Sequence, residues 1–136
     1  MNLLILCTGN SCRSQIAEGF FRKYLGDGSN VYSAGIEAHG VNPNAIKTMA
    51  AIGIDISKHT SNTIEQLPSV KYDYVLTVCD NAKELCPIFP GHHKTLHHSF
   101  QDPASATGTN EEIAAVFATV RDEIDAYARE FCKDLG

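Results

Sequence analysis

The hydrophobic pattern of the chain alternates between short apolar runs and longer segments with helical spacing. Apolar or alternating runs predict strands over residues 3–6, 30–34, 72–78 and 94–98. Apolar positions three and four residues apart predict helices over 15–25, 43–52 and 110–131, and a short helix over 80–85. Strands that alternate with helices build parallel sheets covered on both faces. We therefore predict an α/β fold, a single-domain three-layer sandwich over residues 1–136 with a four-stranded parallel sheet and helices on both faces.

Helix boundaries are indicated by capping residues. Pro43 suits the first turn of the second helix, and Gly53 suits its end. Asn110 is the predicted N-cap of the last helix, and Pro87 is expected to end the short segment 80–85. No repeat, low-complexity tract or interdomain linker interrupts this pattern.

The most informative segment joins the first strand to the first helix. It predicts an oxyanion cradle, because successive backbone amides and a helix N-terminus favour a bound anion. Cys7 is the candidate nucleophile at one end, and Arg13 at the other end can offer a planar fork to two anion oxygens. The same positive field favours the thiolate of Cys7. The predicted oxyanion-binding loop comprises Thr8, Gly9, Asn10, Ser11, Cys12 and Ser14.

Two residues inside this loop suit an unusual backbone path. Gly9 removes a side chain where the backbone has to approach an anion. Asn10 tolerates a positive φ and can hydrogen-bond the loop to itself. The alternative interpretation is a buried structural cysteine followed by an ordinary capped helix.

A second pair of cysteines follows the third predicted strand. Cys79 and Cys86 are seven residues apart, so a continuous helix between them would separate the two Cα atoms by about 10.5 Å. A disulfide requires Cα atoms within about 7 Å. The two can therefore pair only if the segment unwinds, and that is feasible because so short a polar helix is marginal. The alternative is two unrelated core thiols.

Asp102 is the candidate general acid. Pro103 restricts Asp102 to extended conformations, which can aim its carboxyl group inward toward a bound oxyanion. The alternative is an Asp-Pro turn without chemistry.

Composition narrows the classes of function. The 136 residues carry a net charge of −5, which argues against general affinity for nucleic acid or an anionic membrane. No stretch approaches the ~20 apolar residues of a membrane span, and the apolar N-terminus lacks the basic leader of a signal peptide. We expect a cytoplasmic protein and a monomer. An odd number of cysteines, five, favours catalytic, redox or metal roles over a static disulfide framework.

Together these motifs resemble the low-molecular-weight protein tyrosine phosphatase superfamily, and within it the thioredoxin-coupled arsenate reductases. The resemblance covers nearly the whole chain and rests on CTGNSCRSQIAEG, the Cys79 and Cys86-Pro87 pair, and Asp102-Pro103-Ala104 in this order. The paired distal cysteines favour the reductases, because a phosphatase needs no reducing thiols. The small residues at 104–106 stand where phosphatases of this fold usually carry aromatic side chains.

The resemblance implies a relay of three cysteines. Cys7 attacks arsenate held by the loop and Arg13, and Asp102 protonates the departing oxygen. Cys79 then attacks Cys7 and releases arsenite, Cys86 attacks Cys79, and thioredoxin reduces the resulting disulfide. Arsenate is the implied substrate, with phosphate and sulfate as analogues, and no tightly bound cofactor is implied.

The resemblance also implies a potassium site, at Asn10, Glu18, Ser33, Thr60 and Asn62. Asn62 is usually an aspartate in the ion-binding members, and the loss of this carboxylate weakens a site for a hard cation. Cys12 is expected to be dispensable, and Cys132 to be a plain structural or exposed thiol. The histidines at 92, 93, 97 and 98 favour surface positions over a zinc site, since neighbours on a strand face opposite sides.

Two other functions stay open at the level of sequence. A phosphomonoester or phosphotyrosine phosphatase would use Cys7, Arg13 and Asp102 alone. A trithiolate trap for arsenite or zinc would use Cys7, Cys79 and Cys86, but the positive field of Arg13 opposes a cation there.

Overall fold

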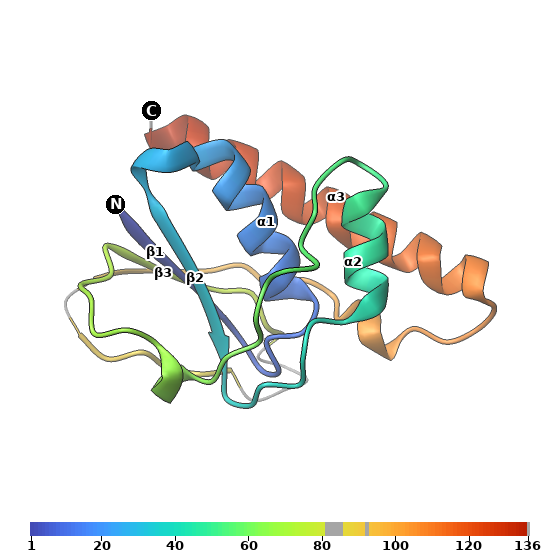
Figure 1. Cartoon of the computed structure of the whole chain (residues 1–136), viewed down its shortest axis with the longest axis horizontal. Helices are drawn as coiled ribbons and strands as arrows, with labels where there is room; N and C mark the ends of the chain where they lie inside the picture. Colours follow the sequence, from blue (N-terminus) through green and yellow to red (C-terminus); the bar gives the residue numbers. More distant parts are fainter. Residues whose placement is uncertain (81–85, 92, 136) are drawn as a thin grey trace.

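The computed structural model describes residues 1–80, 86–91 and 93–135. Its centre is a parallel sheet of four strands in the order β2-β1-β3-β4 (Figure 1). The strands are β1 (Asn2–Cys7), β2 (Asn30–Gly35), β3 (Tyr74–Thr77) and β4 (Lys94–His97). All four predicted strands and the parallel sheet are confirmed, with boundaries that differ by one or two residues.

The two faces of the sheet are covered differently. Leu3 and Ile5 of β1 point into the main core, to which α1 (Arg13–Leu25), α2 (Pro43–Ala50) and α3 (Asn110–Leu135) contribute buried side chains. Leu4 and Leu6 point to the opposite face, into a smaller cluster that includes Ile64 of the 3-10 helix η2 (Ile64–Gln66). The predicted helices on both faces are found, but the second face has only the 3-10 helix η2, since the three α-helices of the described residues all pack on the first (Figure 1).

Local capping explains where the helices begin and end. The Asn42 side chain accepts a hydrogen bond from the Asn44 backbone N–H (2.8 Å), and Pro43 follows in the first turn of α2. Gly53, with a φ of 81°, lies just beyond that helix. The predicted N-cap of α3 at Asn110 is wrong. Thr109 and Glu112 form a reciprocal capping box there, because the threonine hydroxyl reaches the Glu112 N–H (3.1 Å).

The candidate site lies at the edge of the sheet where the order of the strands reverses. β1 lies between β2, to which the chain goes next, and β3, to which it goes after that. Ligands of such sheets bind outside the carboxyl ends of the strands at this point. Leu6 pairs with Thr77 in the register of β1 and β3, and the Val78 N–H donates to the Leu6 carbonyl (3.0 Å). The chain therefore leaves both strands side by side, with Cys7 and Cys79 at the same edge.

The described residues also form two further 3-10 helices, η1 (Gly26–Gly28) and η3 (Pro103–Ser105). The predicted short helix falls almost wholly on residues 81–85, which lie outside the described residues. Among the helices that the structure does describe, none is long and apolar enough to cross a membrane.

Candidate active site

Cys7 ends β1 and is almost fully buried at 2 % exposure. Its sulfur accepts a hydrogen bond from the Asn10 backbone N–H (3.2 Å) and lies 2.9 Å from the Ser14 hydroxyl. The Asn10 side-chain amide donates to that same hydroxyl oxygen (2.8 Å), which leaves the hydroxyl proton of Ser14 for the sulfur. Both donors stabilise negative charge on Cys7, as a nucleophilic thiolate requires.

Asn10 holds the loop in shape. It is the one non-glycine residue with positive φ (47°) among those described, which agrees with the sequence prediction. Its side chain is fully buried, and its oxygen accepts hydrogen bonds from the Asn62 N–H (2.7 Å) and the Gln15 amide (3.2 Å). Asn10 and Ser14 therefore support the loop from beneath, and neither lines the pocket above it.

A pocket of about 740 Å³ opens above the loop. Most of the predicted site residues line it: Cys7, Thr8, Gly9, Ser11, Cys12, Arg13 and Asp102. Ala104 and Ser105, the small residues noted after Asp102-Pro103, also line it. Sequence reasoning missed five further lining residues: His39, Asp80, Ser99, Phe100 and Gln101. Proximity to Asp102 could have indicated the residues at 99–101, whereas nothing in the local sequence indicated His39.

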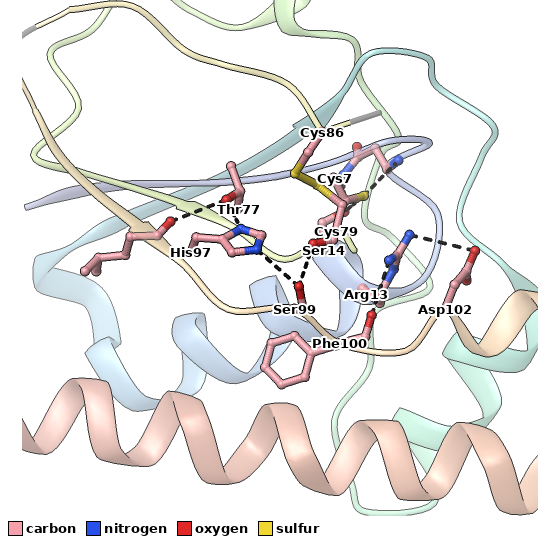
Figure 2. Close-up of a disulfide and its surroundings, with 12 residues drawn as sticks. Cys7, Arg13, Ser14, Thr77, Cys79, Cys86, His97, Ser99, Phe100 and Asp102 are labelled. Atoms are coloured by element: carbon pink, nitrogen blue, oxygen red, sulfur yellow. Dashed lines mark hydrogen bonds and ion pairs between the residues drawn. A yellow bond between two sulfur atoms is a disulfide. The ribbon is translucent and has the colours of Figure 1, made fainter. Parts of the chain in front are cut away.

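Arg13 connects the loop to the segment that carries Asp102. Its side chain is 5 % exposed, and it donates a hydrogen bond from Nη1 to the Phe100 carbonyl (3.3 Å). Its Nη2 lies 3.8 Å from Asp102 Oδ2. Figure 2 shows the guanidinium between these two oxygens. A guanidinium held on one side by the protein keeps a fixed position for an oxyanion.

Asp102 caps the turn that begins η3 and also faces the pocket. Its backbone is extended (φ −77°, ψ 108°), as the following Pro103 predicts, and Oδ1 accepts the Ala104 N–H (3.0 Å) at the start of η3. Oδ2 faces Arg13, and the side chain is 41 % exposed. This places a carboxyl group at the rim of the pocket, where a general acid for an oxygen bound inside it would have to lie.

The backbone of residues 35–39 forms the outer support of the loop. The Glu37 N–H donates to the Thr8 carbonyl and the His39 N–H to the Gly9 carbonyl, both at 3.0 Å. A Cβ on Gly9 would lie 2.7 Å from Nδ1 of the His39 ring. Room for this imidazole is thus a reason for a glycine at position 9 that sequence reasoning did not supply.

Replacing Gly35 by alanine is expected to destabilise the protein and to deform the loop. The new Cβ would lie 2.6 Å from the Thr8 carbonyl oxygen and 2.9 Å from the Asn10 nitrogen, and backbone atoms cannot give way as side chains do. We expect a loss of about 1–3 kcal/mol in the free energy of unfolding, measured in urea. Gly28→Ala is the matched control, because nothing lies within 4 Å of its Cβ position. Equal stability of the two variants would contradict this account of the loop.

Cys79 and Cys86 are joined by a disulfide with a Cα–Cα distance of 5.9 Å. This distance is within the range for pairing that the sequence analysis required. Cys79 is fully buried, whereas Cys86 is half-buried. Figure 2 shows the disulfide beside Cys7, at the switch point of the sheet. The pair thus links a fully buried position after β3 to a more accessible position at Cys86.

The three other cysteines are free thiols. Burial raises the pKa of Cys12 to about 12, and burial also raises the pKa of Cys132. Both are therefore protonated at neutral pH and poor nucleophiles. This agrees with the prediction that neither acts in the chemistry.

The residues predicted to bind potassium form one hydrogen-bonded cluster beneath the loop. The amide nitrogen of Asn10 faces the Ser33 oxygen (3.0 Å), and the Ser33 hydroxyl donates to Glu18 Oε1 (2.5 Å). Thr60 and Asn62 bond to each other nearby. Each oxygen of this set that is buried already has a hydrogen-bond partner.

The charges around Glu18 also oppose a cation. Its Oε2 accepts a hydrogen bond from Arg22 Nε (2.8 Å) and lies 3.5 Å from the His59 ring. Burial lowers the pKa of His59, so that this ring is neutral at neutral pH. The arginine already neutralises the only carboxylate of the set, so these residues do not fit a potassium ion and no step is derived through one.

The histidines do not converge. His97 and His98 point to opposite sides, since His97 bonds to Thr77 and His98 stacks on Phe100 with ring centroids 4.4 Å apart. His93 contacts Phe89, and residue 92 lies outside the described residues. Within residues 1–80, 86–91 and 93–135, no group of histidine, cysteine and acidic side chains is arranged to hold a metal ion.

Comparison with known proteins places this fold and loop in one family. The profile of the low molecular weight phosphotyrosine protein phosphatase family matches residues 2–136, and the chain belongs to this family. An arsenate reductase of Halalkalibacterium halodurans is 56% identical over 131 residues, which cover 96% of this chain and 94% of that protein.

Two solved structures of arsenate reductases are also similar. One is described as being in the phosphate binding state and has a TM-score of 0.79 at 32% identity, with 99% of this chain and 98% of that chain covered. The other is described as being in the oxidized state and has a TM-score of 0.83 at 30% identity, with the same coverage. The predicted family and fold class are confirmed.

Proposed function

We propose that this protein reduces arsenate to arsenite with Cys7 as nucleophile and with Cys79 and Cys86 as a thiol relay. The observation that carries this proposal is the Cys79–Cys86 disulfide at the edge of the sheet where Cys7 also lies. Hydrolysis of a phosphate ester would use the pocket residues alone and would leave this pair without a purpose. The similarity to named arsenate reductases over nearly the whole chain supports the same conclusion.

In the first step, the Cys7 thiolate attacks arsenate bound by the loop amides and Arg13. A sulfur–arsenic bond forms and an arsenic–oxygen bond breaks. Asp102 transfers its proton to the departing oxygen, which leaves as water. Arg13 and the amides stabilise the charge of the arsenate oxygens throughout.

In the second step, the Cys79 thiolate attacks the sulfur of Cys7. A disulfide forms, the sulfur–arsenic bond breaks, and its electron pair stays on arsenic, which changes from As(V) to As(III). Cys86 then attacks Cys79, and Cys7 leaves as a thiolate. Overall, hydrogen arsenate, two thiols and two protons give arsenous acid, one water and one disulfide.

We further propose thioredoxin as the reductant of the Cys79–Cys86 disulfide. A protein that reduces a disulfide with its own pair of thiols needs an accessible sulfur in that disulfide and a surface on which to dock. Cys86 is half-buried, and Ile88 two residues later is 90% exposed, which makes it an apolar contact next to the reducible bond. Such a reductant belongs to the cytoplasm, which also suits the three free thiols, and we propose that the protein acts there as a monomer.

The reductant is tested by following NADPH oxidation that depends on arsenate. We expect turnover with thioredoxin and thioredoxin reductase, and little or none with glutathione and glutaredoxin. Turnover with neither system, or no arsenite in the products, would refute the proposed function. Turnover with glutaredoxin alone would refute thioredoxin as partner and leave the reduction itself in place.

Replacing Ile88 by aspartate is expected to weaken docking of the protein reductant. Loss of an apolar contact at an interface costs about 1–2 kcal/mol, or roughly a tenfold higher KM for thioredoxin. Turnover driven by the small reductant dithiothreitol should not change, because it requires no docking surface. Ile52→Asp is the matched control, since this side chain is also exposed (40%) and belongs to the turn after α2. Equal KM values for thioredoxin in both variants would exclude Ile88 as a contact.

Phosphate ester hydrolysis is a second candidate because the family profile describes phosphatases and the pocket has a nucleophile, an arginine and an acid. The small residues Ala104 and Ser105 line the pocket and provide no aromatic surface for a phosphotyrosine ring. We therefore expect weak turnover of aryl phosphates as a side activity. Stoichiometric binding of arsenite without turnover would instead favour the trithiolate trap.

A further inference from the structure

The Cys79 carbonyl accepts a hydrogen bond from a side chain that the relay itself does not use. Ser99 Oγ donates to this oxygen at 3.3 Å. Cys79 lies beyond the last ladder position of β3, and among the described residues no strand partner holds its carbonyl. Ser99 also lines the pocket that contains Cys7 (Figure 2).

Ser99 is itself oriented by a chain of hydrogen bonds across β3 and β4. His97 Nε2 lies 3.1 Å from Ser99 Oγ, and His97 Nδ1 lies 2.5 Å from Thr77 Oγ1. Ser99 has one hydroxyl proton, which it donates to Cys79, so its oxygen has to accept a proton from Nε2. The Thr77 hydroxyl lies within reach of Nδ1 and also donates to the Leu96 carbonyl (3.5 Å), so the His97 ring is held between Thr77 and Ser99.

The backbone on both sides of Ser99 is fixed as well. The His98 N–H donates to the Thr77 carbonyl (3.0 Å) and the Phe100 N–H to the Val78 carbonyl (3.3 Å). The His98 ring stacks on Phe100, which is 3% exposed, and also contacts Tyr127 of α3. Because both neighbours of Ser99 are held, its hydroxyl cannot follow the Cys79 carbonyl when that carbonyl moves. The hydrogen bond therefore restrains the backbone of Cys79.

The same segment contacts the arginine of the oxyanion loop. The Phe100 carbonyl accepts a hydrogen bond from Arg13 (3.3 Å), and the Phe100 N–H reaches the residue before Cys79. Residues 97–102 therefore connect two parts of the site. One is Arg13, which would hold the anion, and the other is the backbone of Cys79. The position of Cys79 relative to Arg13 therefore depends on residues 97–102 as well as on the oxyanion loop.

We propose that Ser99, oriented by His97, is a positioning residue that holds the backbone of Cys79 in place while its sulfur exchanges partners. This rests on the proposed reduction of arsenate through Cys79. With the carbonyl held, the Cys79 sulfur reaches Cys7 or Cys86 by rotation about its side-chain bonds. Without the hydroxyl, the backbone samples positions from which the sulfur is not in line with Cys7, and attack slows.

The test uses Ser99→Ala in a Cys86→Ser background, in which the relay stops at the bridge between Cys7 and Cys79. One equivalent of arsenate starts a single turnover, samples are quenched by alkylation, and mass spectrometry counts the bridged molecules. We expect bridge formation to slow about three- to tenfold, the effect of one lost hydrogen bond. Hydrolysis of an aryl phosphate uses Cys7, Arg13 and Asp102 but not Cys79, so it should fall less than bridge formation even though Ser99 lines the same pocket. Ser99→Thr should restore the rate, because it keeps the hydroxyl.

The controls separate positioning from general damage. Ser69→Ala removes an exposed serine far along the chain and should leave both rates unchanged. Should Ser99→Ala fold poorly, His97→Phe removes the donor to Ser99 and should slow the bridge in the same direction. An unchanged bridging rate in Ser99→Ala, or an equal fall in bridging and hydrolysis, would overturn the proposal. If the Cys86→Ser variant that retains Ser99 forms no bridge between Cys7 and Cys79, the relay itself is refuted.

Discussion

Replacing Cys7 by serine is expected to abolish both arsenate reduction and aryl phosphate hydrolysis. Every covalent step begins at this sulfur, and a serine hydroxyl at the same position is almost wholly protonated at neutral pH. Loss of a nucleophile costs about 10⁴-fold or more in turnover. Both activities are measured on the same preparation, with arsenite quantified directly and the phenol product followed by absorbance.

Cys132→Ser is the control for this variant. Cys132 is a half-buried free thiol of α3, protonated at neutral pH because burial raises its pKa. It should retain both activities. Binding of phosphate by Cys7→Ser, measured by calorimetry, should persist, because Arg13 and the loop amides are unchanged. Measurable arsenate turnover by Cys7→Ser would mean that another thiol is the nucleophile.

Replacing Cys79 by serine is expected to separate the two activities. Arsenate reduction should fall below detection, because no thiol can then take the sulfur of Cys7 away from arsenic. Hydrolysis of an aryl phosphate should continue at the wild-type rate, because water completes that reaction and Cys79 is not among the residues that line the pocket. No general loss of stability can produce this split within one protein.

The outcome for Cys79→Ser also decides between the candidate functions. Unchanged arsenate turnover with thioredoxin would refute the relay. Loss of hydrolysis together with reduction would indicate that the substitution damages the pocket. Cys86→Ser offers an internal comparison, because it should complete one turnover and then stop with Cys7 bridged to Cys79.

The segments near the active site were predicted well where the residues that determine the local backbone all lie in one short stretch of chain. The strand before Cys7, the positive φ of Asn10 and the extended backbone of Asp102 all follow from local sequence. The cap of α3 was misplaced by one residue. Asn and Thr are both good caps, and the choice of Thr109 depends on the reciprocal bond of Glu112, which a single cap residue does not reveal.

The positions of supporting residues could not be predicted, because they depend on contacts across distant parts of the chain. His39 reaches the pocket because residues 37–39 bond to the loop, and room for its ring is a second reason for a glycine at position 9. Asn10 and Ser14 were predicted to bind the anion as part of the loop. The structure places their side chains beneath it, where they hold Cys7 and one another.

The sequence by itself determined the order of strands and helices, the oxyanion loop with its two reactive ends, and a second cysteine pair unable to bridge along an intact helix. These depend on spacing within short segments, which periodicity and backbone preference control. Tertiary structure alone decided that the three described α-helices pack on one face, that Glu37 and His39 bond to the oxyanion loop, and that Ser99 bonds to the Cys79 carbonyl. Such contacts join residues far apart in the chain, and only the register of the sheet brings them within hydrogen-bond distance.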